Sequence, residues 1–166
     1  RGQIFVGKLL AATTYALLAL ALMGVIAVVA GGLESGFNPL TTPSGTRVSA
    51  GEALGLVAAS FAVYLLPLLA ITAIGVLLST VTRNSAGAVV GTVMVVIVLE
   101  IIGILPGLGG LKPYLLPTQF DAWQGLLRAP IDWSPIVRAG WVCSLYAVPS
   151  LIAAYLVFLR RDVAGG

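Results

Sequence analysis

Few residues of this chain have side chains that could do acid–base, nucleophilic or metal chemistry. The 166 residues include no histidine and one cysteine, Cys143, and only 9% are charged. A histidine base, a histidine-ligated metal and a haem with an axial histidine are therefore excluded, and a single thiol forms neither a cysteine cluster nor an internal disulfide. We expect Cys143 to pack as a small apolar side chain.

No residue spacing in the chain matches a catalytic or nucleotide-binding motif. The sequence lacks a Gly-x-Ser-x-Gly elbow, paired carboxylates and a glycine-rich loop ending in Gly-Lys-Ser or Gly-Lys-Thr. It therefore has no P-loop for ATP, and we expect neither an enzyme nor a cofactor bound by this chain. Nine Lys and Arg without a basic run also argue against nucleic acid as a partner.

Glu100 is the one acidic residue well inside an apolar run, which extends from Val96 to Ile102. A bare carboxylate at bilayer depth is costly, so it must be paired, protonated or close to water. One interpretation is a structural contact with a base such as Arg138 or with a helix end. The other is a polar residue that lines a transport cavity, and the sequence leaves both open.

The elements that would position such residues are four apolar stretches, each long enough to cross a bilayer. A crossing helix needs about 20 mostly apolar residues, because the hydrocarbon core is roughly 30 Å thick. Hydrophobic residues make up 59% of the chain and the mean hydropathy is +1.07. We predict an all-α, polytopic membrane bundle forming a single domain over residues 1–166, with helices at about 5–30, 53–79, 85–105 and 135–159.

Local chemistry marks where these helices begin. Ser49 and Glu52 have the Ser-x-x-Glu spacing of a capping box, which predicts the start of the second helix. Asn84 or Ser85 can cap the third helix after a very short turn, so helices two and three should form an antiparallel hairpin. Ser134, followed by a proline, is suited to cap the fourth helix.

Two prolines lie inside predicted helices. Pro67 interrupts the second helix and Pro149 the fourth. Each removes a backbone donor and bends a helix unless a neighbour repairs the gap. Both residues are hinge candidates.

The segment 106–134 is rich in proline and cannot be one continuous helix. Its central part, 118–128, has the pattern of a short amphipathic helix. All three tryptophans lie in this segment or just beyond it, which is typical of a membrane interface. The predicted apolar face holds Phe120, Trp123, Leu126 and Leu127, and the polar residues Gln119, Asp121, Gln124 and Arg128 should point largely away from it.

Two interpretations of this segment remain. It is a proline-rich loop resting on the membrane, or a partly re-entrant pair of helices that shapes an exit path. On the second interpretation Glu100, Phe120 and Trp123 are the candidate residues of a substrate path.

Basic residues favour one orientation of the chain only weakly, with five on the side of the termini and four on the other. They are more concentrated on the side of the termini, so we predict that both termini are cytoplasmic. Arg160, Arg161 and Asp162 should then anchor the last helix at the cytoplasmic headgroups.

Three passages resemble the membrane subunits of ABC-2 type exporters. Residues Arg1 to Ala11 look like the entry to that family's third helix, and Leu78 to Asn84 look like its short cytoplasmic turn before the fifth. The passage Phe158 to Val163 is similar to the Phe-x-Arg-Arg-Asp ending of such permeases. The family also has a broken, re-entrant helical pair between its last two helices, at the position of residues 106–134.

The resemblance implies that this chain is helices three to six of a six-helix permease in the cell membrane. Because the first residue is Arg1, we expect an N-terminal part with two further helices to precede it. The family implies a dimer of permeases on separate ATP-binding subunits, which hold ATP and Mg²⁺, and export of an amphiphile such as a lipid, drug or lipid-linked glycan. The alternatives are a passive membrane scaffold or accessory subunit, and an ion-coupled secondary carrier.

Overall fold

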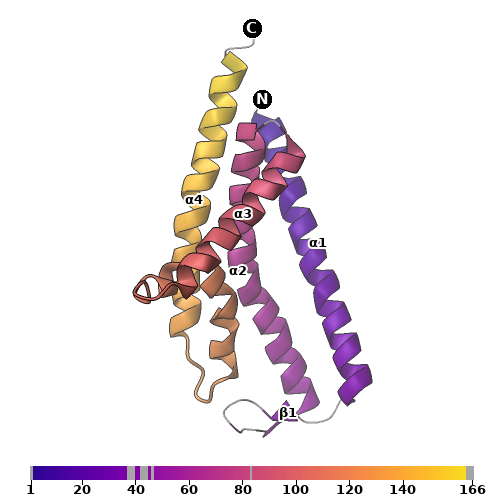
Figure 1. Cartoon of the computed structure of the whole chain (residues 1–166). Helices are drawn as coiled ribbons and strands as arrows, with labels where there is room; N and C mark the ends of the chain where they lie inside the picture. The colour runs from indigo at the N-terminus through magenta and orange to yellow at the C-terminus, as the bar shows by residue number, and fades with distance from the viewer. Residues whose placement is uncertain (1, 37–39, 42–44, 46, 83, 164–166) are drawn as a thin grey trace.

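The computed structural model describes residues 2–36, 40–41, 45, 47–82 and 84–163, and for 2, 4, 35, 40 and 161–163 only the backbone. Long helices dominate it (Figure 1). They are α1 (Gly2–Ser35), α2 (Ala50–Thr82), α3 (Ser85–Ile104) and α4 (Ser134–Val163). Two 3-10 helices, η1 (Lys112–Tyr114) and η2 (Pro117–Leu127), join α3 to α4, and the strands β1 (Leu40–Thr41) and β2 (Arg47–Val48) form a small antiparallel ribbon between α1 and α2.

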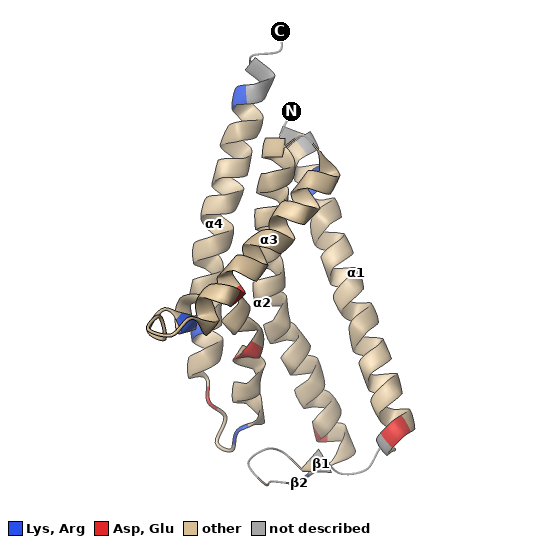
Figure 2. Ribbon diagram, viewed as in Figure 1, with Lys and Arg blue, Asp and Glu red and all other residues tan. Residues whose placement is uncertain are grey.

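The four long helices confirm the predicted all-α membrane bundle. Each is long and apolar enough to cross a membrane, and large apolar side chains are exposed along all of them. The chain is therefore a multi-pass membrane protein. The start of α1 and the end of α4 lie at the same end of the bundle (Figure 1), as an even number of crossings requires. Figure 2 shows that most charged residues lie near helix ends or in the connections.

Three of the helices extend beyond the apolar windows that predicted them. Hydropathy marks the part of a helix that lipid surrounds, whereas hydrogen bonds and caps decide where the helix ends. At α2 the predicted capping box is present. The backbone N–H and hydroxyl of Ser49 both donate to Glu52 Oε2 at 2.9 Å, and the Glu52 N–H donates to Ser49 Oγ at 3.3 Å.

The caps of α3 and α4 are also side chains of short polar residues. Asn84 Oδ1 accepts from the N–H of Ala86 at 3.0 Å, which confirms Asn84 as the cap of α3. Helix α4 begins one residue earlier than predicted. Ser134 is the first residue of the helix, and the group that accepts its N–H and hydroxyl, at 3.0 and 2.7 Å, is Asp132 Oδ1.

Helix α2 is the centre of the bundle, because it contacts α1, α3, α4 and η2. Both internal prolines lie in unbroken helices: Pro67 is fully buried in α2, and Pro149 is exposed on α4. Their role as hinges stays a prediction.

The core beside α2 is made of small side chains, which allow the helices to approach closely. They are Ala70, Ala73, Ala139, Cys143 and Ala154. Cys143 is buried, as predicted.

The η1–η2 segment packs against α2 and α4 rather than lying loosely outside them. Leu116 is 0% exposed and belongs to a cluster with Ala70, Ile74 and Cys143. Ala70 lies 20 residues after Ala50, the first residue of α2, which corresponds to about 30 Å along the helix. The segment therefore reaches far into the bundle, which agrees with a re-entrant arrangement.

The helical type of η2 changes which residues share a face. A 3-10 helix has three residues per turn, so side chains three apart lie on one line. Gln119, Ala122 and Gly125 form the buried line, and Phe120 and Trp123 lie on the next. The prediction that Gln119 points away from the packed face was therefore wrong, because it assumed the 3.6-residue period of an α-helix.

Gly125 allows the chain to fold back from η2 toward α4. Its carbonyl oxygen accepts from the N–H of Asp132 at 3.0 Å and from that of Arg128 at 3.4 Å. A Cβ at this position would collide with the carbonyl oxygen of Asp132. Backbone cannot give way as a flexible side chain does, so the close approach requires glycine.

We predict that Gly125→Ala destabilises the protein by about 1–3 kcal/mol through this overpacking. Gly140→Ala on α4 is the matched control, because no heavy atom lies within 4 Å of its added Cβ. A helical alanine there should be neutral or slightly stabilising. Thermal unfolding in detergent measures both, and equal midpoints for the two variants would contradict the packing described.

Candidate functional site

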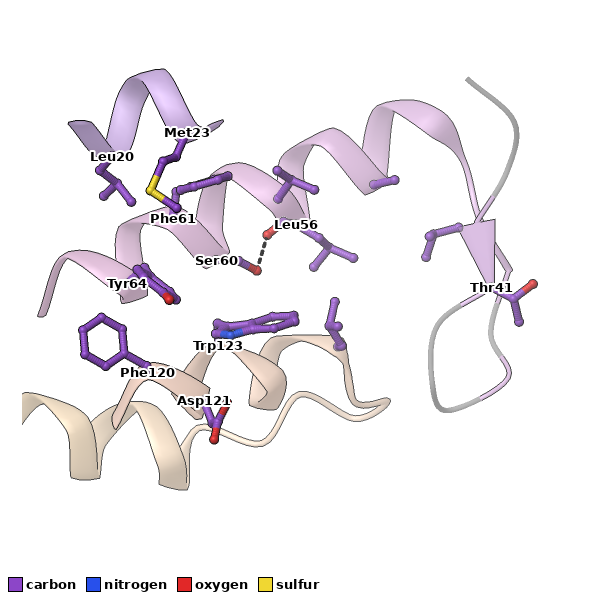
Figure 3. Close-up of a pocket in the computed structure, with 14 residues that line it drawn as sticks. Leu20, Met23, Thr41, Leu56, Ser60, Phe61, Tyr64, Phe120, Asp121 and Trp123 are labelled. Atoms are coloured by element: carbon purple, nitrogen blue, oxygen red, sulfur yellow. Dashed lines mark hydrogen bonds between the residues drawn. The ribbon is translucent and has the colours of Figure 1, made fainter. Parts of the chain in front are cut away.

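The candidate site is an apolar cavity between α1, α2 and η2 (Figure 3). Its volume is about 650 Å³, within the range of ligand pockets. Leu20 and Met23 line it from α1, and the β1–β2 ribbon contributes Thr41 and Val48. The remaining walls come from α2 and η2.

Aromatic side chains form one wall of this cavity. Phe61 and Tyr64 come from α2, and Phe120 and Trp123 from η2. The rings of Tyr64 and Phe120 meet edge to face with centroids 4.8 Å apart, which joins the two elements. Phe120 and Trp123, two of the predicted substrate-path residues, thus lie together on the cavity wall, and their role in transport stays a prediction.

The cavity offers few polar groups to a ligand. The Ser60 hydroxyl donates to the carbonyl oxygen of Leu56 at 2.8 Å, which leaves its own oxygen free to accept. Asp121 is the one charged lining residue, yet Figure 3 shows its carboxylate directed to the far side of η2. There it is exposed and accepts from Gln124 Nε2 at 3.2 Å.

Three consecutive backbone carbonyls just before η2 receive hydrogen bonds from side chains. Gln119 Nε2 donates to the carbonyls of Pro113 and Leu115, both at 2.9 Å, and the Tyr146 hydroxyl donates to that of Tyr114 at 3.3 Å. Gln119 is 3% exposed, so these bonds form in an apolar environment where an unmade bond is costly. Gln119 therefore holds η1 against η2 and fixes the wall that carries Phe120 and Trp123.

Glu100, the third predicted path residue, lies elsewhere. It is exposed on α3, a helix in which Ala88 is the one buried residue. Within the part of the chain that the structure describes, the side chain of Glu100 makes no ion pair or hydrogen bond, and the ion pair found there joins Arg128 and Asp132 at 3.4 Å. The contact with Arg138 considered from the sequence is not formed, and Glu100 does not line the cavity.

The predicted anchor residues lie at the end of α4. Arg160 is exposed, while the side chains of Arg161 and Asp162 lie outside the described residues.

Among the described residues no group of three His, Cys, Asp or Glu could hold a metal. Phe61 and Tyr64 were missed from the sequence, because an aromatic residue in an apolar helix gives no local sign of its partner.

Asp132 lies outside the membrane-spanning helices, in the connection that precedes α4. Hydrogen bonds from the hydroxyl and then the N–H of Ser134 hold the pKa of this carboxyl below its usual value. The nearby positive charges of Arg128 and Arg138 lower the pKa further, although partial desolvation opposes them. The ionised carboxylate is therefore the form that fits the start of α4.

Comparison of the chain with protein-family models, with curated proteins and with solved structures gives no match. The functional argument therefore rests on the residues and on their geometry.

We predict that Gln119→Ala lowers the free energy of unfolding by about 1–3 kcal/mol, because it leaves buried carbonyls without donors. Gln119→Glu keeps the size but removes the amide donors, so it should be at least as damaging. Gln124→Ala, on the exposed side of the same helix, should change stability by less than about 0.5 kcal/mol. Thermal unfolding in detergent compares them, and a tolerated Gln119→Glu would contradict the anchoring role.

Asp132 should make the start of α4 sensitive to acid. Because its folded-state pKa is lowered, the stabilisation is present above the unfolded value of about 3.9 and is lost as pH falls through the folded value. We expect the protection of the amides of Ser134 and of residues 136–138 against hydrogen exchange, corrected for the intrinsic rate at each pH, to fall in that range in the wild type. Asp132→Asn should exchange faster at neutral pH and show less dependence on acid, and identical pH profiles for the two proteins would contradict this.

Proposed function

We propose that this chain is a membrane-spanning permease subunit of an ATP-driven ABC-2 type exporter, which moves an amphiphile out of the cytoplasm. The observation that carries the proposal is the position of η1 and η2. They form a short helical pair between the last two long helices, packed against α2 and α4 and reaching Ala70 of α2. A re-entrant pair at this place is the feature that the resemblance to such permeases implies.

The energy source would be a partner. The sequence has no P-loop, so ATP and Mg²⁺ would bind to a separate ATP-binding subunit. Hydrolysis there would shift the permease between conformations that differ in substrate affinity, which is how binding energy is coupled to transport. Both ends of the bundle's chain lie on one side (Figure 1), and we assign this side to the cytoplasm of a cell membrane.

A second permease copy fits the outer surface of α3. That helix buries one residue within this chain, Ala88, and exposes the Glu100 carboxylate among apolar side chains. A carboxylate at bilayer depth needs a partner or water. A dimer with a water-containing path along the interface would supply either.

Glu100 also favours a second candidate function, an ion-coupled carrier, because an unpaired intramembrane carboxylate can bind a proton or cation. A passive scaffold would require neither Glu100 nor ATP. The three functions therefore differ in what drives substrate movement.

The test is transport by the permease co-purified with its ATP-binding subunit and reconstituted in vesicles. We expect ATP-dependent movement of a phospholipid with a fluorescent acyl chain, and loss of that movement when the Walker A lysine of the ATPase is replaced. Movement that follows an imposed proton or sodium gradient and is abolished by Glu100→Gln would instead establish a carrier. No ATP-dependent movement, with the complex intact, would overturn the exporter.

A further inference from the structure

Two apolar cavities meet at the side chain of Phe61. The first is the candidate site between α1, α2 and η2, and the second, of about 640 Å³, lies between α1 and α2 alone. They have three lining residues in common, Leu20, Val57 and Phe61. Both cavities extend along the same part of α2, from residue 53 to residue 65, so they lie side by side and the Phe61 ring stands between them.

The ring of Phe61 packs against Gly24 of α1. A Cβ on Gly24 would lie 3.3–3.5 Å from three carbon atoms of the Phe61 ring, so the ring packs against bare backbone. Closer to the chain ends, α1 is held to α2 by the cluster that contains Phe5 and Val76. Phe61 thus bridges α1 and α2 and separates the cavity on one side of it from the cavity on the other.

The polarity of the first cavity matches one kind of occupant. Its body is aliphatic and aromatic, and its charged lining residue, Asp121, points away from it (Figure 3). Thr41 lies on the β1–β2 ribbon, well separated from the rings of Tyr64 and Phe120 (Figure 3). A molecule with a long apolar part and a polar end would place hydrocarbon against the rings and its polar end toward the ribbon.

We propose that this cavity binds the hydrocarbon tail of a single membrane lipid, with the headgroup at the β1–β2 ribbon, and that Phe61 keeps the tail out of the second cavity. Lipid tails elsewhere in the bilayer are as apolar as the cavity walls, so the hydrophobic effect does not favour the site. Binding depends instead on van der Waals contact with walls of fixed shape. A fixed side wall at Phe61 then confines the tail to one cavity.

This inference does not depend on transport or on an ATP-binding partner, because it requires only that the helices lie in a bilayer. Its test is photolabelling of the protein in nanodiscs of phosphatidylcholine, using phosphatidylcholine with a diazirine midway along one acyl chain. Labelling of exposed α3 residues, such as Val93 and Ile97, measures contact with bulk lipid. Failure of labelling would leave the exporter proposal standing, and failure of transport would leave this one standing.

We expect labelling of the half-buried lining residues Leu56 and Trp123 to exceed that of α3 by about tenfold, which corresponds to ~1.4 kcal/mol of preference. Ser60→Phe fills the cavity and should abolish the excess. Ser144→Phe is the matched control, because Ser144 makes the same type of bond to the carbonyl four residues earlier but is exposed on α4. Equal labelling of cavity and α3 in the wild type would overturn the site.

The role of Phe61 is tested with the same photolabel at residues that line the second cavity but not the first, such as Val25 and Ala58. In the wild type these residues should be labelled no more than α3. Phe61→Ala joins the two cavities and should raise their labelling to the level at Trp123, whereas Phe61→Leu keeps a partition and should retain the wild-type pattern. Unchanged labelling of Val25 and Ala58 in Phe61→Ala would overturn the assignment of Phe61.

Discussion

The structure depends on one requirement: an irregular backbone packed among apolar helices must satisfy its own hydrogen bonds. Water is absent at that depth to compensate for an unpaired carbonyl, and each such group is costly. Gln119 satisfies the carbonyls of Pro113 and Leu115, and Tyr146 that of Tyr114. With these bonds made, η2 can pack against α2 and α4, and Phe120 and Trp123 come to face Phe61 and Tyr64.

The packing around α2 follows from the same solvent. Where lipid surrounds the helices, association depends on close contact rather than on removing apolar surface from water. Small side chains therefore lie where α2 approaches α4, among them Ala70 and Cys143. Between α2 and α3 the close contacts are Gly75 with Thr92 and Gly91 with Leu78. Along α1 contact is less continuous, and apolar cavities remain on both sides of Phe61.

Features with a local cause could be predicted from the sequence. The apolar runs indicated the four long helices, the Ser49–Glu52 spacing indicated the start of α2, and Asn84 indicated the cap of α3. The fold class and the broken segment before α4 followed in the same way. These signals involve residues within one turn of each other or within one continuous run.

Features that depend on distant contacts could not be predicted. In the 3-10 helix η2 residues three apart lie on one line, so the inward direction of Gln119 could not be read from a pattern with a period of 3.6. The cavity is formed by α1, α2, η2 and the β1–β2 ribbon, so no single stretch of the sequence could predict it. Phe120 and Trp123 could be named as candidates because the amphipathic pattern was correct in part, whereas their partners Phe61 and Tyr64 lie in a helix that is apolar throughout.

The central claim is that η2 is buried on one line of its 3-10 helix against α2 and α4. It is tested most directly by disulfide cross-linking from two adjacent positions of η2 to Ala139→Cys on α4, with Cys143 replaced by alanine and the protein in nanodiscs. Copper phenanthroline should couple Ala139→Cys rapidly to Ala122→Cys, with which it shares a buried cluster, and very slowly to Asp121→Cys, which lies on the exposed side of η2. Equal coupling rates at the two positions would contradict the account.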